Sequence, residues 1–131
     1  MPIMTLSEIE TLCRDALLNV GASQEQADIV AAEIADAEAE GIRNVGLGYM
    51  HLYLKHLKVE KVKPHACPKI VKTSAASTVI DADFGFCHHA YLVGEARLIE
   101  TAREQGVGLM SIHQSSSAGV LGWFVRRLAK E

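Results

Sequence analysis

The chain has 131 residues, of which 49% are apolar and 22% charged, and its formal net charge is −3. This length allows one domain with a single core and is shorter than most complete two-domain enzymes. The slightly acidic balance excludes the basic surface that nucleic acid requires. No apolar run is long enough to cross a bilayer, and the uncharged amino terminus lacks the features of a signal peptide. We therefore expect a cytoplasmic protein, and the high apolar content indicates an interface with another chain.

Cysteine and histidine spacing gives no indication of a metal site. Cys13, Cys67 and Cys87 are widely spaced and include no C-x-x-C pair, so the sequence predicts neither a disulfide framework nor a thiolate cage. Six histidines include no H-E-x-x-H motif, and the adjacent pair His88 and His89 cannot comfortably face one ion. We expect no bound metal.

Residues 1–60 predict an amino-terminal helical layer. Capping-box patterns begin at Thr5 and Ser23, where a hydroxyl is followed three residues later by Glu or Gln. The apolar spacing predicts three helices, over residues 6–20, 24–40 and 49–58. The second helix is expected to have an acidic outer face and a packed side formed by Ala27, Val30, Ala31, Ile34, Ala35 and Ala37.

Residues 61–131 predict part of an α/β sheet, reached through a lysine-rich connector that contains Pro64 and Pro68. The expected strands are 70–71, 78–80 and 107–112, and the expected helices are 89–105 and 118–130. This alternation favours a mixed sheet with covering helices, in which the strand 107–112 is buried and parallel to a neighbour. Because three strands cannot make a well-buried parallel sheet, we predict that another chain continues it.

Polar residues follow two of the expected strands. The turn Ser115-Ser-Ser-Ala-Gly119 can bring hydroxyls and backbone N–H groups close to a ligand, or it can be a flexible loop with one serine capping the next helix. His113 beside it can meet a ligand or bond to backbone. Asp81 and Asp83 fit acid–base chemistry or the acceptance of turn N–H groups. A serine hydrolase is disfavoured because G-x-S-x-G is absent.

Three segments together resemble the malate/L-lactate dehydrogenase family. They are Glu40-Gly-Ile-Arg-Asn-Val-Gly46, Val79-Ile-Asp-Ala-Asp-Phe-Gly85, and Gly106-Val-Gly-Leu followed by the serine turn and Val-Leu-Gly122. This NAD(P)-dependent group is unrelated to the Rossmann-type lactate dehydrogenases. It includes ureidoglycolate and sulfolactate dehydrogenases, diketogulonate reductase and cyclic-imine carboxylate reductases. The resemblance covers nearly all of this chain but only the amino-terminal part of a family member.

The resemblance also identifies functional positions at which this chain departs from the family. The family has Ser-His-Gly, which supplies a proton-donating imidazole, and an arginine three residues later that clamps a carboxylate. The residues at these positions are Asn44, Val45, Gly46 and Tyr49. Valine cannot transfer a proton, and tyrosine cannot form the bidentate charged pair. In the family's Ser-Asn-His-Phe-Gly motif, the second histidine is replaced by Ser117.

These departures lead to two hypotheses. In the first, the chain is the amino-terminal half or small subunit of a diverged oxidoreductase acting on a small 2-oxo or 2-hydroxy acid or a cyclic imine. A partner polypeptide resembling the family's carboxyl-terminal part then supplies most of the NAD or NADP site, giving a hetero-oligomer. In the second, the chain is a catalytically inactive structural or regulatory subunit. A new activity without nicotinamide is a third possibility.

The first hypothesis assigns roles to particular polar residues. The expected catalytic residues are Tyr49, His113 and Ser117. The expected substrate-binding residues are Asn44, Tyr49, His51, Ser115, Ser116 and Gly119. Because most cofactor contacts in relatives lie beyond the matched segment, the resemblance implies that this chain alone binds no cofactor.

Overall fold

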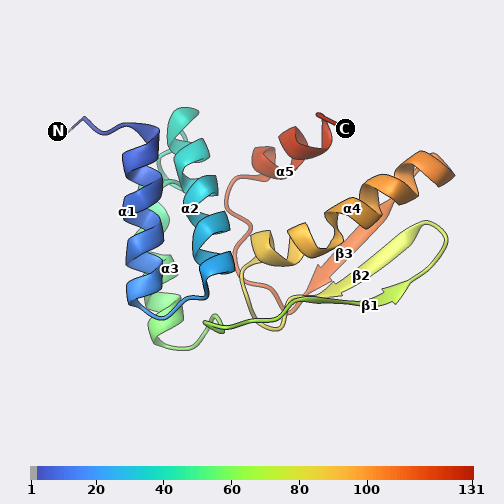
Figure 1. Ribbon diagram of the computed structural model, residues 1–131, viewed down its shortest axis with the longest axis horizontal. Helices are drawn as coiled ribbons and strands as arrows, with labels where there is room; N and C mark the ends of the chain where they lie inside the picture. The colour runs from blue at the N-terminus through green and yellow to red at the C-terminus, as the bar shows by residue number, and fades with distance from the viewer. Residues whose placement is uncertain (1–2) are drawn as a thin grey trace.

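Three helices form the amino-terminal layer (Figure 1). In the computed structural model, which describes residues 3–131, they are α1 (Leu6–Asn19), α2 (Gln24–Ala39) and α3 (Met50–Lys58), with a short 3-10 helix, η1 (Leu47–Tyr49), before α3. Thr5 and Glu8 form the predicted capping box, and the Ser23 side chain accepts a hydrogen bond from the Gln26 backbone. The predicted packed side of α2 is buried. The helical layer is therefore confirmed, whereas its boundary at residue 60 stays a prediction.

A mixed sheet forms the other part of the structure. Its strands are β1 (Lys69–Thr73), β2 (Ser77–Asp81) and β3 (Leu109–His113), in the order β1-β2-β3. β1 is antiparallel to β2, and β3 is parallel to β2. The parallel pair is connected by the crossover helix α4 (Cys87–Gln105), as parallel strands require. The α/β class and the parallel pairing of β3 are thus confirmed.

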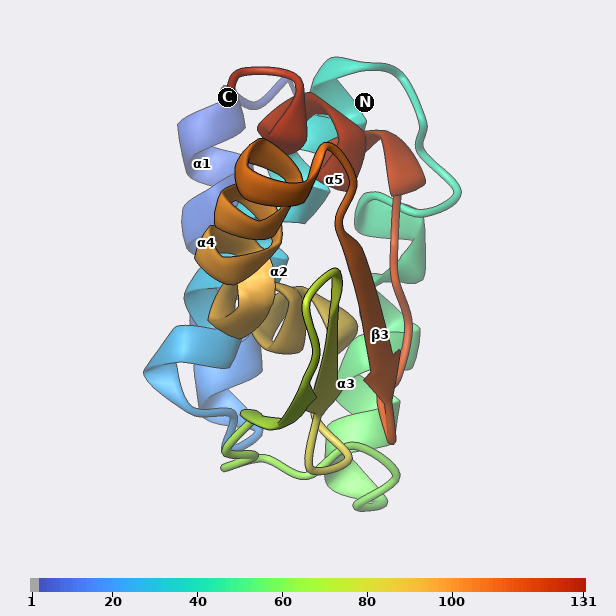
Figure 2. The same cartoon turned by 90° about the vertical axis from the view of Figure 1, so that its right-hand side faces the viewer.

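Helix α4 covers one face of the sheet (Figures 1 and 2). Gly94 allows this close approach, because a Cβ there would lie 2.9 Å from Ile80 Cδ1 and would overlap Met110. On the opposite face no helix of residues 3–131 packs over the strands. Leu109 and Val107 are 65% and 64% exposed. The prediction of a fully buried strand at 107–112 is wrong in the described structure, because only one face of β3 has a helix to pack against.

The last helix, α5 (Leu121–Leu128), begins three residues later than predicted. The backbone of the preceding turn excludes an earlier start, because Gln114, Ser117 and Gly119 have φ angles of 52°, 48° and 56°, in the left-handed region that a right-handed helix cannot include. No helix of the described residues is both long and apolar enough to cross a membrane.

One buried amide on α2 connects the two parts of the structure. Gln26 is fully buried. Its Nε2 donates to the carbonyl oxygens of Lys63 at 3.0 Å and Pro64 at 2.8 Å, and its Oε1 accepts from the Phe86 N–H at 3.0 Å. Because buried polar backbone groups need partners, these three bonds fix the connector and the start of α4 against α2.

Replacing this amide tests its role. The nearly isosteric change Gln26→Leu leaves the Phe86 N–H without a partner, whereas the Lys63 and Pro64 carbonyls keep their bonds from the Ala66 and Ser23 N–H groups. We expect the free energy of unfolding to fall by about 2 kcal/mol, measured by urea denaturation. The control is Gln24→Leu, because Gln24 bonds only to Asp28 at an exposed position, and it is expected to change stability by less than about 0.5 kcal/mol. Equal effects of the two substitutions would contradict the assignment.

Candidate functional site

Two of the predicted site residues meet on Tyr53 of α3. The Ser117 hydroxyl donates to the Tyr53 hydroxyl at 3.2 Å. The Tyr49 ring lies edge-on to the Tyr53 ring, with a centroid distance of 5.1 Å, and Phe86 packs on Tyr53 in the same way at 5.2 Å. Tyr53 is fully buried. Tyr49 and Ser117, the positions at which the resemblance implies an arginine and a histidine, thus converge on one buried phenol.

Backbone hydrogen bonds hold the serine turn and its flanking residues, 114–120, in place. The Ser116 N–H donates to the Gly85 carbonyl at 2.9 Å, and the Ser116 carbonyl accepts from the Cys87 N–H at 3.0 Å. Val120 is the N-cap of α5, and no side chain caps this helix. The alternative interpretation of the turn, in which a serine caps the following helix, is therefore wrong.

A buried carboxylate anchors the end of the serine turn. Glu33 is fully buried on α2, and its Oε1 accepts from the Val120 N–H at 2.7 Å. Gly119 faces this carboxylate so closely that a Cβ would overlap it. Burial raises the pKa of Glu33 to about 7, although the bond from Val120 acts in the opposite direction. Beside it, burial lowers the pKa of His88 to about 4.

Glu33, His88 and Tyr53 were not among the residues that the sequence predicted for the site. The acidic outer face expected for the second helix is wrong for Glu33, which is buried. A signal was present, because Gln26, Val30 and Glu33 follow one another at steps of four and three and so lie on one side of the helix. Polar residues on an apolar stripe indicate buried groups with specific partners.

The loop that carries the first family motif lies at the end of α2. Glu38 Oε1 accepts from the Leu47 N–H at 2.8 Å, and Gly46 is buried where a Cβ would overlap the Glu38 carboxylate. Asn44 is exposed and Val45 is half-buried. The backbone of the motif is thus held in place, and the side chains of Asn44 and Val45 have no ionisable group.

The two candidate histidines lie apart from Tyr53. His51 is exposed, and its Nδ1 is 2.9 Å from the Gly48 carbonyl oxygen. His113 is exposed at the end of β3, in register with Asp81. In the part of the chain that the structure describes, neither imidazole hydrogen-bonds to the hydroxyl of Tyr53 or Ser117. Their predicted roles, and those of exposed Ser115 and half-buried Ser116, remain predictions.

The two aspartates at the end of β2 organise a turn. Asp81 Oδ1 accepts from the Asp83 N–H at 2.8 Å. Asp83 Oδ2 accepts from the Cys67 N–H at 3.0 Å and pairs with Lys63 Nζ at 2.8 Å. Of the two alternatives left open by the sequence, the structure shows the acceptance of backbone N–H groups.

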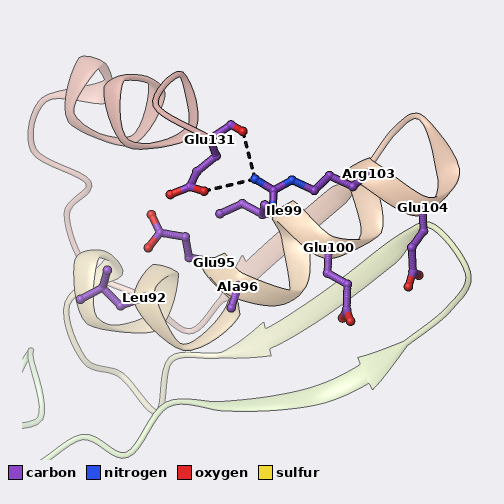
Figure 3. Close-up of a pocket in the computed structure, with 8 residues that line it drawn as sticks. All are labelled: Leu92, Glu95, Ala96, Ile99, Glu100, Arg103, Glu104 and Glu131. Carbon is purple, nitrogen blue, oxygen red and sulfur yellow. Dashed lines mark hydrogen bonds and ion pairs between the residues drawn. The ribbon is translucent and has the colours of Figure 1, made fainter.

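A hollow along α4 has an acidic lining (Figure 3). Arg103 is its one cationic group, and its guanidinium donates to the Glu131 carbonyl at 3.0 Å and is 3.3 Å from that residue's carboxylate. The residues that line it are Leu92, Glu95, Ala96, Ile99, Glu100, Arg103, Glu104 and Glu131. None of them is a predicted site residue. Two of its carboxylates form ion pairs with arginines outside the lining, Glu95 with Arg127 and Glu100 with Arg97.

The start of α5 offers no free backbone N–H at Val120 for a pyrophosphate. A helix amino terminus is a common pyrophosphate site, but the Val120 N–H at the start of α5 already donates to the buried Glu33 side chain. Among residues 3–131, no three histidine, cysteine or acidic side chains are grouped closely enough to hold a metal ion.

Comparison with known proteins identifies the family. A sequence profile described as malate/L-lactate dehydrogenase matches residues 4–131, and the chain belongs to this family. It is 33% identical over 110 residues to the Δ1-pyrroline-2-carboxylate reductase of Ancylobacter novellus, covering 84% of this chain and 32% of that protein. It is 34% identical over 129 residues to the (2R)-3-sulfolactate dehydrogenase (NADP(+)) of Chromohalobacter salexigens, covering 98% of this chain and 38% of that protein.

Comparison with solved structures also finds members of this family. The sulfolactate dehydrogenase from Methanocaldococcus jannaschii matches with a TM-score of 0.88 at 28% identity, covering 96% of this chain and 37% of that one. The Δ1-piperideine-2-carboxylate reductase from Pseudomonas syringae matches with a TM-score of 0.84 at 29% identity, covering 88% and 35%. The chain therefore has the family's fold and spans about a third of the length of the relatives it matches.

Because Gly119 lies against Glu33, a side chain at this position should destabilise the serine turn. Gly119→Ala combines a left-handed φ with a steric overlap on Glu33, and we expect it to lower the free energy of unfolding by about 3 kcal/mol. Gly106→Ala is the matched control, because Gly106 has a φ of 78° and nothing within 4 Å of its Cβ position. It should cost only about 1 kcal/mol. Thermal or urea unfolding measures both, and equal losses would exclude a steric role for Glu33.

Proposed function

We propose that this chain is the amino-terminal part, or small subunit, of a diverged NAD(P)-dependent oxidoreductase. Its family consists of dehydrogenases and reductases that act on small acids or cyclic imines, and we assign this chain a small 2-oxo or 2-hydroxy acid or a cyclic imine as substrate. The observation that carries the proposal is the convergence of Tyr49 and Ser117, at two family functional positions, on Tyr53.

The hydroxyl groups at this place suit substrate binding better than proton transfer. Tyr49 can offer a hydrogen bond to a carboxylate or carbonyl oxygen, and Ser117 can do so when its O–H turns away from Tyr53. Such bonds are weaker than the charged pair formed by an arginine. Burial raises the pKa of the Tyr53 hydroxyl, although the bond from Ser117 opposes the change, and Tyr53 is therefore a poor acid. In this proposal the proton for the reaction comes from a group outside the Tyr53 cluster.

A partner polypeptide is proposed to supply most of the NAD or NADP site. The exposed side chain of Leu109 on β3 supports this, because an apolar strand edge without a neighbour tends to pair with another chain. An adjoining hollow between α4 and α5 is lined largely by apolar residues, including Leu98, Ala102 and Leu128. A second polypeptide resembling the family's carboxyl-terminal part would extend the sheet here and form a hetero-oligomer.

One observation favours a second candidate function, that of a catalytically inactive structural subunit. Val45 cannot transfer a proton, and the Ser117 hydroxyl already donates to a buried group of its own chain. In such a subunit the Tyr53 cluster would only hold the serine turn in place and stabilise the complex.

Substitutions in the purified complex distinguish the two functions. Activity with NADH or NADPH is measured on small 2-oxo acids and cyclic imines for Ser117→Ala and Tyr49→Phe. If the cluster binds substrate, at least one substitution should lower kcat/KM about tenfold or more, because a hydrogen bond made in the transition state is lost. Ser74→Ala, at the exposed end of the β1–β2 hairpin, is the control and should have no effect.

Activity that is unchanged in both variants would contradict substrate binding by the cluster and favour the structural subunit. Titrating the complex with NADH and NADPH while following nicotinamide fluorescence tests the cofactor directly. A complex that converts substrate but binds neither nucleotide would contradict the oxidoreductase proposal.

A further inference from the structure

Two titratable side chains lie beneath the serine turn with no exposure to solvent. Glu33 Oε2 is 3.8 Å from His88 Nε2, and both side chains are completely buried. Neither of these two atoms has a hydrogen-bond partner among the described residues. Aromatic rings border the imidazole, with Phe124 stacked at a centroid distance of 5.5 Å and Trp123 edge-on at 5.6 Å. A separated ion pair in such surroundings is costly.

We propose that Glu33 is a positioning residue for the serine turn and that it carries a proton, so that it and the neighbouring His88 are both neutral. Glu33 Oε1 fixes the Val120 N–H, and Gly119 provides the space for the carboxyl group. The two facing atoms form no hydrogen bond with each other, so the proton belongs to Glu33 alone. With both groups neutral, the penalty of burying charge is avoided. The relevance of the turn to substrate rests on the proposed function, but the anchor does not.

The other charged and titratable groups near Glu33 are consistent with a neutral carboxyl group. Tyr53 faces it from α3, and the negative charge of Asp36, on α2 itself, favours protonation of Glu33. Arg126 of α5 is the nearby cation, and it pairs with Asp36 and Glu40 instead. No cation of the described chain forms an ion pair with Glu33 apart from the imidazole of His88 when that is protonated.

The pair has opposite effects on the pH dependence of stability. The pKa of Glu33 is raised from 4.5 to about 7, so the stability that Glu33 contributes is present below pH 4.5 and is lost as pH rises through 7. The pKa of His88 is lowered from 6.5 to about 4, so its contribution is present above pH 6.5 and is lost as pH falls through 4. Between pH 4.5 and 6.5 the two contributions to stability therefore cancel in the wild-type chain.

Removing either member should expose the contribution of the other. Urea unfolding from pH 4 to pH 8 is compared for the wild type, Glu33→Gln, His88→Phe and the double variant. Glutamine keeps an oxygen for the Val120 N–H, and phenylalanine keeps the stack on Phe124. Relative to wild type, Glu33→Gln should gain stability as pH rises from 4.5 to 7, by on the order of tenfold or more in the unfolding equilibrium constant. His88→Phe should gain stability as pH falls from 6.5 to 4, and the double variant should follow the wild-type slope between pH 4.5 and 6.5.

Slopes of the same sign for Glu33→Gln and His88→Phe, or variants offset from wild type equally at every pH, would overturn the assignment of two neutral groups. If His88→Phe does not fold, the sign of the change in stability with pH for Glu33→Gln is by itself enough to support or overturn the proposal. Amide hydrogen exchange tests the positioning role, because Glu33→Leu removes the acceptor and should speed exchange at Val120 at least tenfold over Glu33→Gln. Equal rates in the two variants would overturn it. None of these readouts uses enzyme activity, so their failure is distinguishable from failure of the proposed function.

Discussion

Two buried polar side chains on α2 determine where the later segments of the chain lie. Gln26 bonds to the backbone of Lys63, Pro64 and Phe86, and Glu33 bonds to that of Val120. Because a buried polar group that loses its partner is costly, these bonds leave the connector, the start of α4 and the serine turn few alternative positions. The placement of Ser117 over Tyr53 follows from this constraint.

The chain has the fold of its family, while the resemblance implies that the side chains of proton transfer differ. Gly46 and Gly119 both face carboxylates of α2, and a Cβ at either position would overlap Glu38 or Glu33. These glycines are therefore required by packing, whatever chemistry the neighbouring residues perform. The positions at which the resemblance places histidines hold Val45 and Ser117, which packing tolerates. Within this fold, the backbone can therefore stay the same while the chemistry of the side chains changes.

The sequence predicted those features that depend on local pattern. Capping boxes at Thr5 and Ser23 and the apolar spacing of α2 are short-range signals, and the order of several motifs indicated the family. The late start of α5 and the partner of Glu33 could not be predicted in this way, because the hydrogen bond between Glu33 and Val120 joins residues 87 positions apart. The exposure of β3 depends on which elements pack over it, and the sequence of the strand alone does not reveal those elements. The sequence predicted only part of the Tyr53 cluster, because Tyr53 occupies an ordinary apolar position in the predicted helix.

The open face of the sheet connects the fold to the proposed partner. Leu109 and Val107 remain exposed beside an edge that no other strand of residues 3–131 pairs with, and such an edge favours association. Native mass measurement of the protein purified from its source tests this account most directly. It predicts a complex with a second polypeptide that Leu109→Asp dissociates, whereas Val59→Asp, at another exposed apolar residue, leaves it intact. A wild-type chain that is monomeric and unfolds cooperatively, or a complex that survives Leu109→Asp unchanged, would contradict it.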